Sequence, residues 1–89
     1  MKATLSKWLS DLIAPVGGRV SGSGGQSAVL FFPPGESLVF IEGDNGIKEW
    51  ASGGRYGEFD PALAPENYTP ALAMAAIDKA RAEARRGKD

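Results

Sequence analysis

The 89-residue sequence contains neither cysteine nor histidine, and these two absences exclude several kinds of chemistry. Without cysteine, the chain cannot form a disulfide. Without histidine, it lacks the side chain whose unperturbed pKa lies closest to neutral pH, which is also the commonest metal ligand. Zinc sites, haem ligation by histidine, and Cys-His or Ser-His-Asp catalysis are therefore excluded.

Long apolar runs and phosphate-binding motifs are also missing. No run is long enough to cross a membrane, and Lys7 and Asp11 interrupt the segment in which a signal peptide would need a continuous apolar core. The glycine-rich stretch VGGRVSGSGGQS has no P-loop lysine, and Ser27 stands in place of the third glycine of G-x-G-x-x-G. We expect a cytoplasmic protein that contacts no membrane and binds no cofactor or small molecule. Residues 16–27 are predicted as a flexible connection with a short edge strand around 19–21.

Charge is low overall but unevenly distributed. The net charge is −1, yet residues 20–68 carry seven carboxylates against two basic residues, while residues 1–19 and 69–89 each have a net charge of +2. Nucleic-acid affinity comes largely from Lys and Arg that neutralise phosphates, so this acidic middle argues against direct nucleic-acid binding. With 43% apolar and 24% charged residues, the composition is typical of a globular protein, and its length predicts a single domain over 1–89.

Apolar spacing predicts one helix at each end of the chain. The first, over about residues 4–14, is closed by Pro15 and has an apolar stripe at i, i+3, i+4, i+7 and i+8: Leu5, Trp8, Leu9, Leu12 and Ile13. The second, over about residues 70–86, follows a loop at 60–68 and begins with Thr69 as its N-cap and Pro70 in its first turn. Its stripe consists mostly of small side chains, which let a helix lie close to a sheet: Ala73, Ala76, Ile77, Ala80 and Ala84.

The stretch AVLFFPPGESLVFI predicts the first hairpin of a sheet over about residues 28–59. Its strands, 28–32 and 37–42, are joined around the turn dipeptide Pro34-Gly35. A loop of two or four residues gives the same register, with Phe31 opposite Leu38. One face then carries Val29, Phe31, Leu38 and Phe40, and the other carries Ala28, Leu30, Phe32, Val39 and Ile41.

The GDNG turn that follows leaves two registers for the next strand, IKEWAS. A two-residue loop places Glu42 opposite Glu49, which is a repulsive pair. A three-residue loop places Glu42 opposite Lys48 and Phe40 opposite Trp50. We predict the second register because it is better in both charge and aromatic packing.

The predicted fold class is α+β, a small antiparallel β-meander of three to five strands packed with an N-terminal and a C-terminal α-helix. Where the helices lie stays open at this point. If one helix covers each face, the double apolar pattern is fully explained. If both lie on the aromatic face, the other face is free for a partner, and burying its large side chains contributes about 6 to 12 kcal/mol gross: Leu30, Phe32, Val39 and Ile41.

Carboxylates are the only catalytic groups available, and their predicted positions do not suit catalysis. They cluster at one hairpin end and in the strand that follows: Glu42, Asp44, Glu49, Glu58 and Asp60. A general acid needs a carboxyl whose pKa is raised by burial or by a like charge, and hairpin ends are exposed. The EGDNG stretch also lacks the spacing of a calcium loop. We therefore expect no enzyme, no catalytic residue and no metal site.

A short, cysteine-free, acidic α+β chain without catalytic groups is similar to the small proteins with which phages and mobile elements block host machinery, anti-CRISPR proteins among them. The resemblance is one of class and rests on no shared motif. It implies a non-enzymatic protein-binding module, an inhibitor whose acidic residues meet a basic host surface: Glu42, Asp44, Glu49, Glu58 and Asp60. The alternative is a structural or assembly subunit that self-associates, for example as a homodimer, through Leu30, Phe32, Val39 and Ile41.

Overall fold

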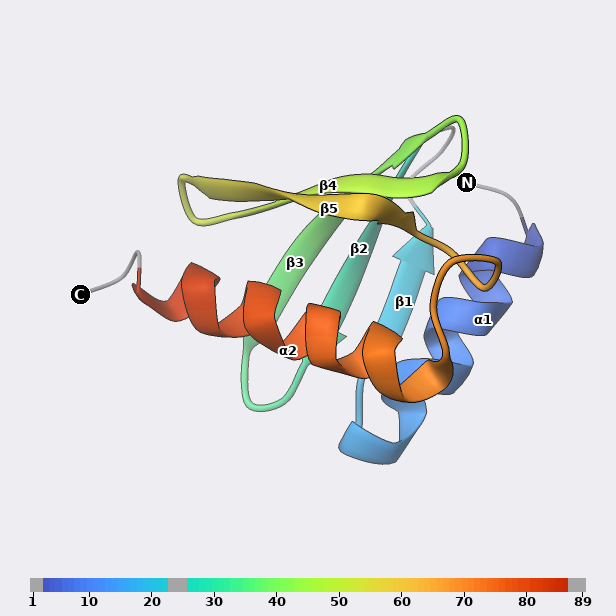
Figure 1. Ribbon diagram of the computed structural model, residues 1–89. Coiled ribbons are helices and arrows are strands. Elements are labelled where there is room, and N and C mark those ends of the chain that lie inside the picture. Colours follow the sequence, from blue (N-terminus) through green and yellow to red (C-terminus); the bar gives the residue numbers. More distant parts are fainter. Residues whose placement is uncertain (1–2, 23–25, 87–89) are drawn as a thin grey trace.

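The computed structural model describes residues 3–22 and 26–86 (Figure 1). Helix α1 (Ala3–Ile13) runs into a short 3-10 turn, η1 (Ala14–Val16). The strands follow in chain order: β1 (Arg19–Gly22), β2 (Ser27–Phe32), β3 (Glu36–Gly43), β4 (Gly46–Ser52) and β5 (Arg55–Leu63). Helix α2 (Pro70–Arg86) is the last element of the described chain.

Within the described residues, the strands form one antiparallel sheet in the order β1-β2-β3-β4-β5. The predicted α+β meander with a helix at each end is thereby confirmed. Strand β1 lies where a short edge strand is predicted around residues 19–21, within the glycine-rich connection, of which residues 23–25 lie outside the described chain. At the other end the sheet is larger than predicted, because β5 continues to Leu63, into the predicted loop at 60–68.

Helix α1 follows the periodic signal predicted for it. Leu5, Leu9 and Ile13 are buried, one turn apart. On the solvent side, Lys7 and Asp11 form an ion pair of 3.2 Å at i,i+4 spacing, which supports the helix locally. The apolar stripe of α1 therefore faces the core.

Helix α2 begins at the predicted position. Its first residue is Pro70, and the Thr69 hydroxyl accepts a hydrogen bond of 3.3 Å from the backbone N–H of Leu72, as an N-cap does. The buried residues of α2 come from the small-residue stripe, so the helix lies close to the sheet: Ala73, Ile77, Ala80 and Ala84.

The β2–β3 hairpin has a loop of three residues, 33–35, and the predicted register is therefore wrong. Phe32 pairs with Glu36 and Leu30 with Leu38, one residue away from the prediction. Because side chains alternate along a strand, a shift of one residue turns every side chain of β3 to the other face relative to β2. The two faces are thus regrouped: Ala28, Leu30, Phe32, Leu38 and Phe40 on one, and Val29, Phe31, Val39 and Ile41 on the other.

The β3–β4 hairpin reaches the predicted pairing of Phe40 with Trp50, but by another route. Its loop has two residues, 44–45, and Glu42 pairs with Ile47 rather than with Lys48, so that part of the prediction is wrong. A β-bulge between Ile41 and Glu42 then restores the aromatic pair.

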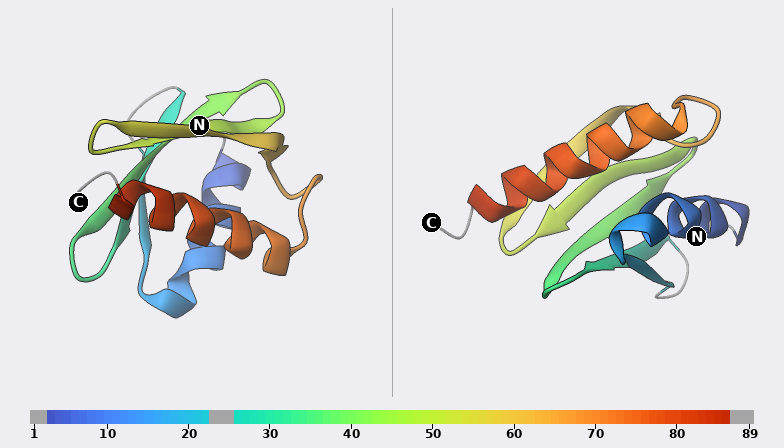
Figure 2. Two further views of the ribbon diagram at one scale, coloured as in Figure 1. Left: turned by 60° about the vertical axis from the view of Figure 1, so that its left-hand side comes forward. Right: turned by 90° about the horizontal axis from the view of Figure 1, so that it is seen from below.

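Both helices pack against the same face of the sheet, so the face that carries Leu30 and Phe32 is the covered one. Figure 2 shows the sheet curving around α2, with α1 beside that helix. The inward side chains of the strands form one core with both helices: Leu9, Ile13, Leu30, Phe32, Leu38, Phe40, Trp50 and Ile77. No helix in residues 3–22 or 26–86 is long and apolar enough to span a membrane.

Candidate functional site

The face of the sheet that carries Val29, Phe31, Val39 and Ile41, called the open face below, is covered by neither α1 nor α2. Its central row crosses all five strands, because its members are successive cross-strand partners: Ser21, Val29, Val39, Ala51 and Tyr56. Cross-strand partners point to the same side, so they form a continuous surface. Val39 is 36% exposed and Tyr56 is 75% exposed, which makes this row accessible to a partner.

A cation lies on one flank of the central row. Arg19 in the edge strand β1 pairs directly with Phe31 in β2. The guanidinium carbon of Arg19 lies 5.7 Å from the centre of the Phe31 ring, within the range of a cation–π contact. Phe31 itself is 40% exposed. This contact places a positive charge beside an accessible aromatic ring at the β1 edge of the open face.

Two carboxylates lie on the opposite flank. Glu49 pairs with Ile41 on one side and with Glu58 on the other, so the two acidic side chains are direct cross-strand neighbours. Like charges in such a pair repel each other and destabilise the sheet. Within residues 3–22 and 26–86, neither carboxylate takes part in an ion pair. The open face therefore has an acidic corner at β4–β5, opposite its basic corner at β1.

The five acidic residues predicted as one binding cluster lie in different places. Glu49 and Glu58 are on the open face, as described above. Glu42 and Asp44 instead line an open hollow of about 620 Å³, together with Glu66 from the loop after β5. Asp60 lies in a groove between β5 and α2, beside Tyr68 and Lys79, and Glu58 also lines this groove from the edge strand β5.

The four apolar residues predicted as a binding surface are also divided. Leu30 and Phe32 are 0% and 2% exposed and belong to the core, so they cannot contact a partner in this fold. Val39 and Ile41 do lie on the open face, at 36% and 38% exposure.

Sequence reasoning missed two accessible aromatic residues of this face, Phe31 and Tyr56. The available signal was the prediction of a short strand around residues 19–21. Once such a strand pairs with β2, its alternation places polar Arg19 and Ser21 beside Phe31 and Val29, which marks that face as the solvent side.

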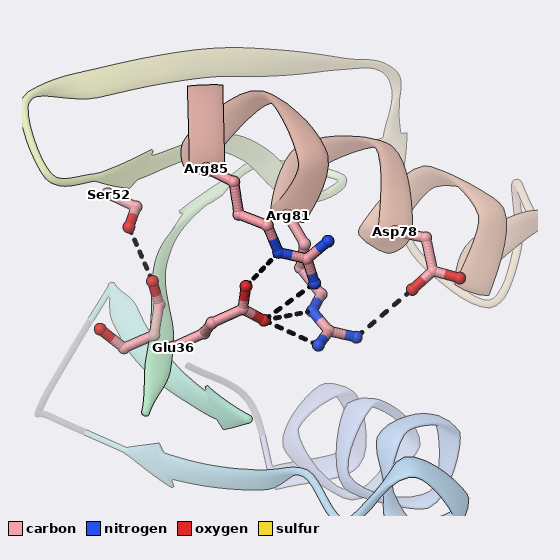
Figure 3. A network of polar contacts seen from close by, with 6 residues as sticks. Glu36, Ser52, Asp78, Arg81 and Arg85 are labelled. Atoms are coloured by element: carbon pink, nitrogen blue, oxygen red, sulfur yellow. Dashed lines mark hydrogen bonds and ion pairs between the residues drawn. The ribbon is translucent and has the colours of Figure 1, made fainter. Parts of the chain in front are cut away.

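A separate polar cluster joins β3 to α2 (Figure 3). The Glu36 carboxylate accepts hydrogen bonds of 2.7 and 3.1 Å from Nη2 and Nε of Arg81, one of 3.1 Å from Nη2 of Arg85, and a further one from Nε of Arg85. The guanidinium carbon of Arg81 also lies 4.1 Å from the centre of the Phe32 ring. These bonds attach the C-terminal half of α2 to the β2–β3 hairpin.

The charge state of Glu36 indicates a structural role. Its hydrogen bond to Arg85, aided by Arg81, lowers the pKa of Glu36 from 4.5 to about 2, although partial burial acts in the opposite direction. A general acid at neutral pH needs a raised pKa, which this carboxylate does not have. The cluster of Glu36, Arg81 and Arg85, called the Glu36 clamp below, holds α2 against the β2–β3 hairpin.

The described residues contain no group of three or more acidic side chains placed to hold a metal ion. The open face combines the exposed apolar side chains of Phe31, Val39 and Ile41 with charges of both signs. Comparison of the chain with protein-family models, with curated proteins and with solved structures finds no match.

Proposed function

We propose that this protein acts without catalysis, as a protein-binding module whose contact surface is the open face. The observation that carries this proposal is the exposure of Phe31, Val39 and Ile41, between 36% and 40%, on a sheet face that neither helix covers. When one face of a sheet is in water, the side chains on that face are normally polar. Contiguous exposed apolar patches are typical of interaction surfaces.

The free energy available from these side chains sets a condition on the partner. Fully burying a Val, Ile or Phe side chain contributes about 1.5 to 3 kcal/mol, so covering the exposed third of Phe31, Val39 and Ile41 contributes about 2 to 3 kcal/mol. This is well below the total expected from the sequence, because Leu30 and Phe32 are already buried in the core. Association costs about 4 kcal/mol or more in lost freedom. The partner must therefore supply apolar surface of its own and complementary charge.

A second candidate function is the inhibitor expected from the sequence. The observation that favours it is the acidic pair of Glu49 and Glu58, whose repulsion a basic partner surface would relieve. Proteins that handle nucleic acids carry such basic surfaces. In this version the open face captures a host protein, and reversing the charge of Glu58 abolishes capture.

Site-specific photocrosslinking in the native cells tests the contact surface. A photoreactive phenylalanine analogue is placed at Val39 on the open face, and at Leu72 as the control, because Leu72 is 59% exposed but lies on α2. We expect a discrete adduct from position 39 and none from position 72. An equal yield from both positions, or no adduct from position 39, would contradict the proposal.

A further inference from the structure

We propose that the partner of the open face is a second copy of this chain, bound as a two-fold symmetric homodimer in which Arg19 of each copy meets Glu58 of the other. This inference rests on the proposed function and names its partner. It follows from how the charges and the apolar centre are arranged on the open face.

The basic and acidic corners lie at opposite ends of one diagonal of this face. Arg19 is in β1 and Glu58 is in β5, the two edge strands, which are about 19 Å apart at the usual strand spacing. Cross-strand pairing places Arg19 in the same row as Ser37 of β3. It places Glu58 in the same row as Ile41 of β3. These two positions of β3 are four residues apart, which corresponds to about 14 Å. Val39, in the central strand and midway between Ser37 and Ile41, lies at the centre of the diagonal.

This arrangement is complementary to itself. A two-fold interface presents the same patch from both copies, so each group must find its complement on that same patch. A two-fold axis that passes between two stacked sheets, perpendicular to the diagonal, places each Arg19 over the partner's acidic corner and Val39 beside its own symmetry mate. Corners of like charge do not meet. Each arginine also relieves the repulsion between Glu49 and Glu58 in the other copy.

The size of the face sets the strength of the dimer. Five strands at the usual spacing span about 24 Å, and their mean length is about 20 Å, so the face has a flat area of about 500 Å² per copy. Because the sheet curves around α2, the open face is convex, so two copies together bury at most about 1,000 Å², which is at the lower limit of specific interfaces. We therefore expect a reversible dimer that forms and dissociates with concentration, rather than an obligate one.

Charge exchange between two variants tests this inference. Arg19→Glu alone and Glu58→Arg alone each place like charges over one another twice per dimer, so each variant should dimerise about tenfold more weakly or worse. An equimolar mixture of the two should form a heterodimer with the strength of the original, since every contact then joins opposite charges. Glu66→Arg is the matched control, because Glu66 is exposed but lies at the hollow beside α1 rather than on the open face. Sedimentation equilibrium over a dilution series compares the original chain, the three variants and the mixture, and circular dichroism verifies that each variant is folded.

The outcomes separate this inference from the function on which it rests. A concentration-dependent dimer that is weakened by each single reversal and restored in the mixture supports the inference. A monomer at all concentrations, or a mixture that regains nothing, overturns it. If the chain is monomeric and position 39 crosslinks to a different protein, the second copy is refuted while the binding function stands. If the chain is monomeric and position 39 gives no adduct, both are refuted.

Discussion

Replacing Glu36 by glutamine should destabilise the protein in a way that depends on pH. Glutamine keeps the shape of the side chain but removes its charge, so Arg81 and Arg85 lose the carboxylate that they share, and Arg81 keeps only its longer ion pair of 3.6 Å with Asp78. Arg81 is the more affected, because its side chain is only 15% exposed and water cannot readily replace the lost carboxylate.

The magnitude follows from the pKa of Glu36. A pKa that falls from 4.5 to about 2 on folding corresponds to at most about 3.4 kcal/mol of stability at neutral pH. The Glu36 side chain is 23% exposed and that of Arg85 is 57% exposed, so solvent screening reduces this value. We expect Glu36→Gln to cost about 1 to 2 kcal/mol at pH 7.

The sign of the pH dependence is fixed by the direction of the shift. Because the folded-state pKa of Glu36 lies below its unfolded value, the clamp contributes its full stability above pH 4.5 and loses it as the pH falls from 4.5 toward about 2. The glutamine variant has no such titration. The difference in unfolding free energy between the two proteins should therefore shrink across this interval.

Urea unfolding at a series of pH values, followed by the fluorescence of buried Trp50, measures this difference directly. Contributions to the pH dependence that the two proteins share cancel in the difference. Glu66→Gln is the control, because Glu66 is exposed and belongs to none of the ion pairs found among the described residues. A difference that stays constant from pH 7 to pH 2, or that is absent at pH 7, would refute the reasoning.

Three further substitutions test the packing of the core and the hydrogen bond between Tyr68 and Pro61. Gly57→Ala should destabilise the fold by about 1 to 3 kcal/mol, because the added Cβ would lie 2.5 Å from Nε1 of buried Trp50, whereas Gly22→Ala meets nothing within 4 Å; equal melting temperatures for the two variants would contradict this packing. Ile77→Ala should cost about 2 to 5 kcal/mol in urea unfolding, since Ile77 is 0% exposed, and the control Leu72→Ala on the same helix should cost under about 0.5 kcal/mol. Tyr68→Phe should cost about 0.5 to 1.5 kcal/mol, because it removes the hydrogen bond of 2.7 Å that the Tyr68 hydroxyl donates to the carbonyl oxygen of Pro61; thermal unfolding at unchanged temperature would show that this bond contributes nothing.

The helices could be predicted from the sequence because their signals are local. The predicted range 4–14 compares with Ala3–Ile13 in the structure, and the predicted range 70–86 is the same as Pro70–Arg86. Proline near the start or end of a helix, an N-cap threonine and apolar spacing all act within a few residues. No distant contact was needed to locate these elements.

The register of the β2–β3 hairpin could not be predicted in this way. The turn residues around Pro34-Gly35 allow loops of different length. Whether the loop has an even or an odd number of residues decides on which face of the sheet each side chain of β3 lies. In the structure, the three-residue loop places Phe32 and Glu36 on the covered side, where both meet Arg81 of α2. The hydrogen bond between Arg81 and Glu36 joins residues 45 positions apart, so no local sequence pattern predicts it.

This shift of one residue in the β2–β3 register divides the predicted apolar binding residues between the core and the surface. Val39 and Ile41 lie on the accessible face in the structure, whereas Leu30 and Phe32, which share their face in the predicted register, lie in the core because the loop has three residues. The bulge between β3 and β4 has a similar effect on the acidic residues, because it separates Glu42 from the cross-strand pair of Glu49 and Glu58. Errors in register therefore change a predicted binding surface more than they change a predicted fold.

The apolar run from Ala28 to Ile41 has two separate causes in this structure. Its inward half is explained by the core that the strands form with both helices. Strand propensity alone does not explain the outward half, because threonine fits a strand about as well as valine or isoleucine and exposes less apolar surface. Phe31, Val39 and Ile41 bury more than half of their surface without a partner, yet they leave a continuous apolar strip between charges of opposite sign. The interface proposed above would account for such a strip, and the arrangement of its charges is the reason for proposing a second copy of the same chain as the partner.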